Sequence, residues 1–323
     1  MTTLRRPTGL RGGSTGRLPD RIMRAGSGLF AVGVVVLVVA IGVMLAVSSQ
    51  LTWATFGLSF ITGTDWDPVA SIYGALPFIV GTLVTSLLAL LLAAPIGLMT
   101  AIFLAELAPR RVALPLSFLV ELLAAIPSVV IGLWGVFVLS PFLRGTVEDW
   151  VTQTLGKVVP FFAGPTFGVG IFAAGVILAI MILPTIVAIS REVITAVPTS
   201  QREAMLALGA TRWETVTKVV LPYAASGIVG AVILGLGRAL GETMAVTMVI
   251  GNKTQIPTRL FDQGQTISSH IATTFNEASI GLQTSSLIAL GLVLLVMTIG
   301  LNIVARLLVR RVAGDGVGMA TGG

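Results

Sequence analysis

Long apolar runs alternate with short polar segments along the whole chain. Six runs with few charges lie at about residues 28–49, 74–104, 112–143, 167–190, 223–250 and 285–309. A bilayer core of about 30 Å needs roughly 20 consecutive apolar residues in one helix. The pattern therefore predicts an all-α membrane protein with about six transmembrane helices.

Prolines fall inside the second and third runs, which are longer than one simple span requires. Pro95, Pro127 and Pro141 each remove a backbone donor. Such positions are tolerated within a membrane where neighbouring groups replace the lost hydrogen bond. We expect tilted or broken helices there.

The distribution of lysine and arginine predicts the orientation, because cytoplasmic loops retain positive charge. One alternating set of loops and ends holds most of the cations: Arg5, Arg6, Arg11, Arg17, Arg21, Arg24, Arg110, Arg111, Arg191, Arg202, Arg212, Lys218, Arg306, Arg310 and Arg311. The opposite set holds only Arg144, Lys157, Lys253 and Arg259, while Arg238 lies within a run. Both termini are therefore expected in the cytoplasm.

The two ends of the chain are expected to differ from the transmembrane domain, residues 28–311. Residues 1–27 are rich in Arg and Gly and predict a flexible basic segment against anionic lipid. The Gly-rich tail, residues 312–323, predicts disorder. The first apolar run follows arginines as a signal peptide would, but it is too long, so we expect an uncleaved anchor.

Composition supports a lipid environment and excludes several kinds of function. The 323 residues are 55% hydrophobic and 11% charged, which leaves too little polar surface for a soluble globule. The net charge of +6 is spread over loops, whereas a nucleic-acid site gathers cations on one face. Cysteine is absent, and the single histidine, His270, is expected to be a solvated loop residue. We therefore predict no metal site, no catalytic residue and no enzyme.

A polar segment at about residues 199–222, between the fourth and fifth runs, begins with a helix-start pattern. Ser200 and Glu203 have the spacing of a capping box, in which each residue's side chain accepts a hydrogen bond from the other's backbone. We expect a helix at about 201–208. Gly209 should end it, because glycine enters the left-handed conformation without a Cβ penalty.

A second helix start follows at once. Thr211 and Glu214 repeat the capping-box spacing, so the segment predicts a helix, a glycine corner and another helix. A compact knob of this kind would transmit a push from a soluble partner into the adjoining spans. Alternatively, the segment only links two spans.

The fifth run contains two opposite charges, Arg238 and Glu242. Each unpaired charge at the centre of a bilayer costs about 2.5–3.5 kcal/mol on insertion scales. Their i, i+4 spacing would allow a simple bridge on one helix face. The functional interpretation is favoured, because Arg offers a fork of donors to an oxyanion while the carboxylate orients it or accepts a proton from it. Gly237 and Gly241 are expected to allow close helix packing.

Glu121, in the third run, is a further candidate for the substrate pathway. An ATP site is not expected in this chain. The run 251–254, Gly-Asn-Lys-Thr, lacks the earlier glycine that P-loop spacing requires.

The polar segment resembles the EAA loop of bacterial ABC importer permeases. The matching positions are Glu203, Ala204, Gly209, Leu221 and Pro222, with Met205 and Val219 as apolar departures from the usual residues. In that family the loop is a coupling helix that docks into a groove of a cytoplasmic ATPase. The resemblance therefore implies that Glu203, Ala204 and Gly209 form the docking site.

Two further stretches are similar to the phosphate-specific members of that family. Residues 237–243, Gly-Arg-Ala-Leu-Gly-Glu-Thr, look like their signature, and residues 121–130 are similar to the PstC type rather than the PstA type. The resemblance implies a type I importer permease fold and a permease that carries inorganic phosphate into the cytoplasm across the bacterial inner membrane.

The same resemblance implies partners. These are a PstB-like ATPase that binds ATP and Mg, a PstA-like second permease in a heterodimer, and a PstS-like phosphate-binding protein outside the membrane. No cofactor is expected in this chain.

Three alternatives remain at the level of sequence. The EAA-like loop alone also fits a permease for sulfate or molybdate, against which the Arg238 and Glu242 motif argues. A secondary anion transporter would use these two charges without an ATPase. An intramembrane enzyme lacks a nucleophile with a base, or a metal cluster, in this sequence.

Overall fold

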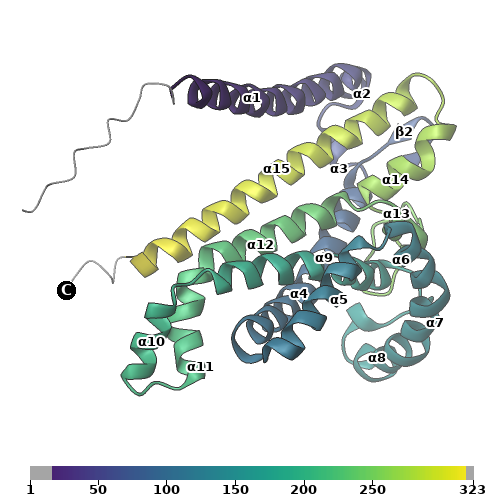
Figure 1. The fold of residues 1–323 in the computed structure, drawn as a ribbon. Helices are drawn as coiled ribbons and strands as arrows, with labels where there is room; N and C mark the ends of the chain where they lie inside the picture. Colours follow the sequence, from purple (N-terminus) through teal and green to yellow (C-terminus); the bar gives the residue numbers. More distant parts are fainter. Residues whose placement is uncertain (1–16, 318–323) are drawn as a thin grey trace, which may run out of the picture. The chain divides into compact units, whose positions relative to one another are not determined.

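The computed structural model describes the backbone of residues 17–317 and the side chains of residues 22–307 (Figure 1). In this part of the chain, six helices are long and apolar enough to cross a membrane: Ile22–Ser48, Leu76–Leu107, Ser128–Lys157, Ile171–Thr195, Arg212–Gly241 and Leu282–Leu307. The predicted all-α membrane fold with six spans is confirmed. The chain divides after Val47 into two compact units.

The first unit contains helix α1 (Arg17–Ser48) except for its last residue. Residues 17–27, predicted to be flexible, are helical. Arginine is a good helix former, and a proline such as Pro19 is tolerated in the first turn of a helix. The rest of the predicted flexible segment, residues 1–16, lies outside the described residues.

The second unit begins at Ser48 and contains the remaining elements. In order they are α2 (Gln50–Phe56), α3 (Ser59–Thr62), β1 (Trp66–Asp67), β2 (Ile72–Tyr73), α4 (Leu76–Ile102), η2 (Phe103–Leu107), α5 (Arg110–Ala125), α6 (Ser128–Trp134), η3 (Gly135–Leu139), α7 (Ser140–Phe142), η4 (Leu143–Glu148), α8 (Asp149–Thr154), η5 (Leu155–Lys157), η6 (Pro160–Phe162), α9 (Ile171–Thr195), α10 (Thr199–Ala207), α11 (Arg212–Thr215), η7 (Val216–Val220), α12 (Leu221–Gly241), α13 (Met244–Val249), α14 (Ile267–Thr274), η8 (Phe275–Glu277) and α15 (Leu282–Val317).

The C-terminal helix α15 extends to Val317, so residues 312–317 of the predicted disordered tail are helical. The apolar helix simply continues through the basic residues that follow it, since arginine favours helix. Residues 318–323 lie outside the described part of the chain.

The third predicted run is interrupted in the structure, whereas the second is continuous. The third run breaks at Ile126 and Pro127, both in extended conformation, which separates α5 from α6. A proline pushes the residue before it out of the helical region, and this ends α5. Pro95, in contrast, lies inside the continuous helix α4, and Pro141 lies in α7, between the π-helical turns η3 and η4 of one continuous span.

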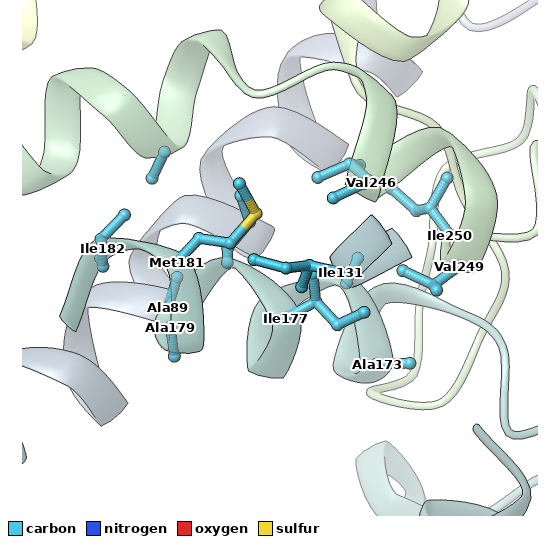
Figure 2. Close-up of a cluster of buried hydrophobic side chains, with 14 of the residues drawn as sticks. Ala89, Ile131, Ala173, Ile177, Ala179, Met181, Ile182, Val246, Val249 and Ile250 are labelled. Atoms are coloured by element: carbon cyan, nitrogen blue, oxygen red, sulfur yellow. The ribbon is translucent and has the colours of Figure 1, made fainter. Parts of the chain in front are cut away.

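Helix α9 forms the centre of the second unit. It is apolar on all sides and the most buried of the spans, and it packs along α4, α12 and α5. Small residues allow the close approach: Gly175 faces Leu88 of α4, and Gly97 faces Ile186 of α9. Figure 2 shows the resulting core, in which Ile177 and Met181 of α9 meet Ile131 of α6 and Val246 of α13.

A smaller hydrophobic cluster lies where the connections 49–75 and 251–281 meet the starts of α4 and α15. Its centre is Phe60, Phe78, Ile267 and Leu287, and Trp66 packs against it from the β1–β2 hairpin. The hydroxyl of Thr82 on α4 accepts a hydrogen bond from Ile267 N at 3.0 Å, which ties α14 to α4.

The prediction that His270 is a solvated loop residue is wrong. It lies in α14 and is 3% exposed, between the rings of Phe78 and Trp66. The local polar sequence suggested exposure, whereas the aromatic rings that bury the imidazole come from distant segments.

Candidate functional site

The polar segment forms two short helices joined at a glycine, as predicted. Helix α10 ends at Ala207, and Gly209, just after the C-cap Leu208, has a φ of 83°. Gly209 N donates to Leu206 O at 3.0 Å, and Ala210 N donates to Met205 O at 3.2 Å. These two bonds are the Schellman motif, which satisfies the last carbonyl groups of the helix. The segment therefore has a fixed corner.

One of the two predicted capping boxes is present. Thr211 N donates to Glu214 Oε2 at 2.9 Å, and Glu214 N donates to Thr211 Oγ1 at 3.2 Å, so the box that starts α11 is confirmed. The box at Ser200 is wrong. Pro198 is the N-cap of α10 and the helix starts at Thr199, so Ser200 already lies inside the first turn. Its hydroxyl is therefore not at the N-cap position.

The surface of the α10–α11 knob is partly apolar. Glu203, Ala204 and Gly209 are exposed together with Leu208, 84% exposed, and Trp213, 59% exposed. We call this set the knob surface. Exposed apolar side chains beside a charged one are typical of a protein-docking surface.

Leu221 and Pro222, the other two matched residues of the EAA-like loop, have structural roles. Leu221 packs against a buried cluster that includes Val216, Val220 and Ala224, and Pro222 lies in the first turn of α12. The π-helical turn η7 runs into α12 without a break, so this proline lies within a continuous span and removes one backbone donor from it. These two residues join the knob to α12 and lie outside the knob surface.

The simple i, i+4 bridge between Arg238 and Glu242, which was the alternative to the functional interpretation, does not form. Helix α12 ends at Gly241, and Glu242 is extended, with φ −67° and ψ 129°. Because Arg238 is helical and Glu242 is not, the two side chains do not share one helix face. No ion pair joins them among the described residues. Glycines at 235, 237 and 241 weaken the helix before the break.

Glu242 is held at this break by two contacts. Its Oε1 accepts a hydrogen bond from Ala245 N, in the first turn of α13, at 3.3 Å. Its backbone carbonyl accepts one from Ser268 Oγ of α14 at 2.9 Å. The carboxylate is half-buried, and its position is fixed by α13 and α14.

Arg238 lies one turn before the break and is exposed on α12. Within the described part of the chain, its guanidinium takes part in no hydrogen bond or ion pair. Gly237 and Gly241 beside it have open space where a Cβ would be, so in this chain they do not serve the predicted close packing. Gly235, three positions before Arg238, packs on Ile186. The Arg238 face of α12 is therefore open.

Glu121 is also exposed, on α5. No hydrogen bond or ion pair among the described residues joins it to Arg238 or Glu242. The structure therefore does not bring the three predicted pathway residues into direct contact with one another.

The breaks at Pro127 and Glu242 are brought near each other, because the helices that follow them pack together. Helix α13, just after Glu242, packs on α6, just after Pro127, and Gly132 faces Ala245 and Met248. Broken helices within a membrane are typical of binding sites in transporters, because they free backbone groups at depth.

A groove of about 790 Å³, which the sequence did not predict, lies between α12 and α15. It is lined by Ser226, Leu234, Asn302 and Arg306, among others, and Leu234 lies one helical turn from Arg238. Arg306 counted only as a topology-setting cation in the sequence. Its contribution to a groove depends on the packing of two helices that are distant in the chain.

The helical domain with its knob has a fold shared with the permeases of ABC transporters. A permease chain in the crystal structure of a bacterial alginate ABC transporter in complex with an alginate pentasaccharide-bound periplasmic protein matches with a TM-score of 0.59 at 19% identity. The match covers 92% of this chain and 98% of that one. A chain of the MetNI methionine ABC transporter in an inward-facing conformation matches with a TM-score of 0.52 at 20% identity, over 74% and 94%. These likenesses establish the fold.

Sequence comparison gives the family. The profile of the binding-protein-dependent transport system inner membrane component matches residues 93–314, and the chain belongs to this family. It is 46% identical to the phosphate transport system permease protein PstC of Pasteurella multocida, over 91% of this chain and 92% of that protein. The corresponding PstC of Mesorhizobium japonicum is 46% identical over 91% of each chain, and PstC 1 of Mycobacterium tuberculosis is 40% identical over 80% and 83%.

The predicted resemblance to PstC-type permeases is thus confirmed. The relatives are permease subunits of a transport system, so this multi-pass membrane protein is a transport component and not an enzyme.

Proposed function

We propose that this chain is the membrane-spanning subunit of an ATP-driven importer that moves inorganic phosphate into the cytoplasm. The names of its relatives support phosphate as the substrate. The arginine- and lysine-rich loops support a bacterial inner-membrane orientation with both termini in the cytoplasm. The knob of α10 and α11 then faces the cytoplasm.

The observation that carries the proposal is the open Arg238 beside the break at Glu242. A guanidinium at membrane depth costs about 2.5–3.5 kcal/mol unless an anion or water compensates it. Its fork of N–H donors matches the oxygens of an oxyanion. Arg238 is therefore the proposed contact for phosphate on its way through the membrane.

Glu242 supplies selectivity in this proposal. Phosphate near neutral pH carries a proton that a carboxylate accepts in a hydrogen bond, whereas sulfate is fully deprotonated and would be repelled. The Ala245 amide and the Ser268 hydroxyl hold Glu242 in place for this role. Glu121 stays a predicted member of the pathway.

The groove between α12 and α15 is proposed as the inner part of the path. It begins one turn from Arg238, and Arg306 is the charged residue that lines it. A second cation would receive the anion after Arg238 releases it.

The proposed partners follow from the same relationship. A PstB-like ATPase would bind ATP and Mg and dock on the knob surface. A PstA-like permease would form a heterodimer with this chain across the open face of α12, and a PstS-like protein outside the membrane would deliver phosphate.

The test is uptake of radiolabelled phosphate into proteoliposomes that contain this chain with its second permease, ATPase and binding protein. We expect uptake that requires ATP and is unaffected by excess sulfate or molybdate. Inhibition by either competitor would assign the chain to another oxyanion. Uptake that proceeds without ATP would instead establish a secondary transporter.

A further inference from the structure

A single arginine connects the knob to two transmembrane helices. Arg202 of α10 donates from Nε to Glu106 Oε1 at 3.1 Å, and from Nη2 to the same oxygen at 2.7 Å. Glu106 belongs to η2, the continuation of α4. Nη2 also donates to Ile194 O at 2.7 Å, and Nη1 donates to Val197 O, at the end of α9.

The surroundings favour a rigid connection. The side chains of Arg202 and Glu106 are only 18% and 14% exposed, so water and salt screen the pair less than a surface pair. The carbonyl groups at the end of α9 carry the negative end of the helix dipole, which attracts the guanidinium. A planar fork with several simultaneous bonds has little freedom to rotate.

Helix α10 has few other connections to the membrane domain. It packs chiefly on α11, the other helix of the knob, and on η7, which belongs to the span that follows. Arg202 thus fixes α10 to the ends of α4 and α9. These two helices share the largest contact in the unit, and α9 also packs on α12, which carries Arg238.

We propose that Arg202 and Glu106 are positioning residues that transmit movement of the docked knob to the α4–α9 pair. The proposal rests on the proposed function, because it takes the knob as the ATPase contact. The pair touches neither substrate nor ATP. Its loss should leave docking and ATP hydrolysis in place while less phosphate is carried for each ATP hydrolysed.

The first experiment measures phosphate uptake and ATP hydrolysis together in the reconstituted complex. Arg202→Met and Glu106→Gln should each lower the ratio of phosphate to ATP at least threefold, while the ATPase still co-purifies. Arg202→Lys, which retains charge but loses the fork, should recover part of the ratio. The double variant Arg202→Met with Glu106→Gln should be no worse than the more severe single variant, as expected of two residues that act as one unit.

The control is Arg110→Met. Arg110 is an exposed arginine at the start of α5, four positions from Glu106, and among the described residues it has no hydrogen-bond partner. The ratio of phosphate carried to ATP hydrolysed should be the same in Arg110→Met as in the wild type. A pair that only stabilises the fold would reduce uptake and hydrolysis in parallel, and an unchanged ratio in both single variants would overturn the proposal.

A second experiment requires no transport. The chain contains no cysteine, so spin labels can be placed at two introduced cysteines, Ala207→Cys on α10, which is outside the knob surface, and Glu192→Cys on α9. Both positions are exposed. In the purified complex, the distance distribution between the labels should be narrow and should broaden with Arg202→Met. An unchanged distribution would contradict a positioning role, even if phosphate proved to be the wrong substrate.

Discussion

The imidazole of His270 stacks on the ring of Phe78, with centroids 4.0 Å apart and planes inclined by 18°. Its Nδ1 lies 3.1 Å from Gln265 Oε1, which accepts hydrogen bonds only, so Nδ1 carries the proton. Trp66 covers the ring from the side, with centroids 4.6 Å apart. Burial of this kind favours the neutral imidazole and lowers the pKa of His270 to about 4.

The first prediction concerns pH. An unfolded histidine has a pKa of about 6.5, so between pH 6.5 and 4 the unfolded chain binds a proton that the folded chain does not. The folded state should lose stability as the pH falls through this window, by up to about 3 kcal/mol. Thermal unfolding in detergent at pH 7, 6 and 5 measures the loss.

The matched variant is His270→Gln, which cannot titrate. Carboxylates contribute equally to both proteins, so the difference between the two pH profiles isolates the imidazole. Parallel profiles would show that the pKa of His270 is the same in the folded and the unfolded protein.

The second prediction concerns Gly209. At φ 83° a side chain with a Cβ is strained by roughly 1–2 kcal/mol, although the space around it is open. Gly209→Val should distort the knob corner and weaken co-purification of the ATPase, with membrane insertion unchanged. Gly300→Val is the control, because Gly300 also has open space but lies inside α15. Equal ATPase recovery from both variants would refute the docking role.

The third prediction concerns Arg238. Arg238→Gln should abolish phosphate uptake, because the neutral amide lacks the charge and the forked donors. The assembled complex should be recovered in normal amount, since Arg238 has no partner among the described residues. Lys157→Gln, which removes an exposed charge from η5, should transport normally. Normal uptake by the Arg238 variant would exclude it from the pathway.

The fourth prediction concerns the groove. Arg306→Gln should slow uptake several-fold without abolishing it, because Arg238 still admits the anion. The measurement is the initial rate over a range of phosphate concentrations. An unchanged rate would limit Arg306 to a role in membrane orientation.

The fifth prediction tests the core in Figure 2. A Cβ at Gly135 would clash with Ile177 and lie 2.9 Å from Val249, so Gly135→Ala should destabilise the unit by about 1–3 kcal/mol. At Gly145 a Cβ has open space, and Gly145→Ala should have little effect. Thermal unfolding in detergent compares the two variants.

The sequence predicted what depends on local composition. Six spans follow from the length and apolarity of each run, and the Thr211 capping box follows from residues three apart. The helix at Ser200 was misplaced by only a small shift, because Pro198 moved its start. Even this small shift was enough to remove the predicted hydrogen bonds.

Features that join distant segments were not predictable in this way. The helices on both sides of the break at Glu242 are apolar, so the hydropathy of the sequence does not mark the break. The burial of His270 needs Phe78, and the bond between Arg202 and Glu106 spans 96 positions of the chain. Each depends on the packing of helices, which a single sequence does not display.

The span that joins the knob to Arg238 contains one π-helical turn, η7. Such a turn closes with i→i+5 bonds and so accommodates one residue more than an α-helical turn. Deletion of one residue within η7 would convert it to regular α-helix and leave both flanks facing as they do now. The same deletion within α12 would rotate everything beyond it by about 100°. Along this span, deletion of one residue should therefore be tolerated only within η7, which lies next to the knob and far from Arg238.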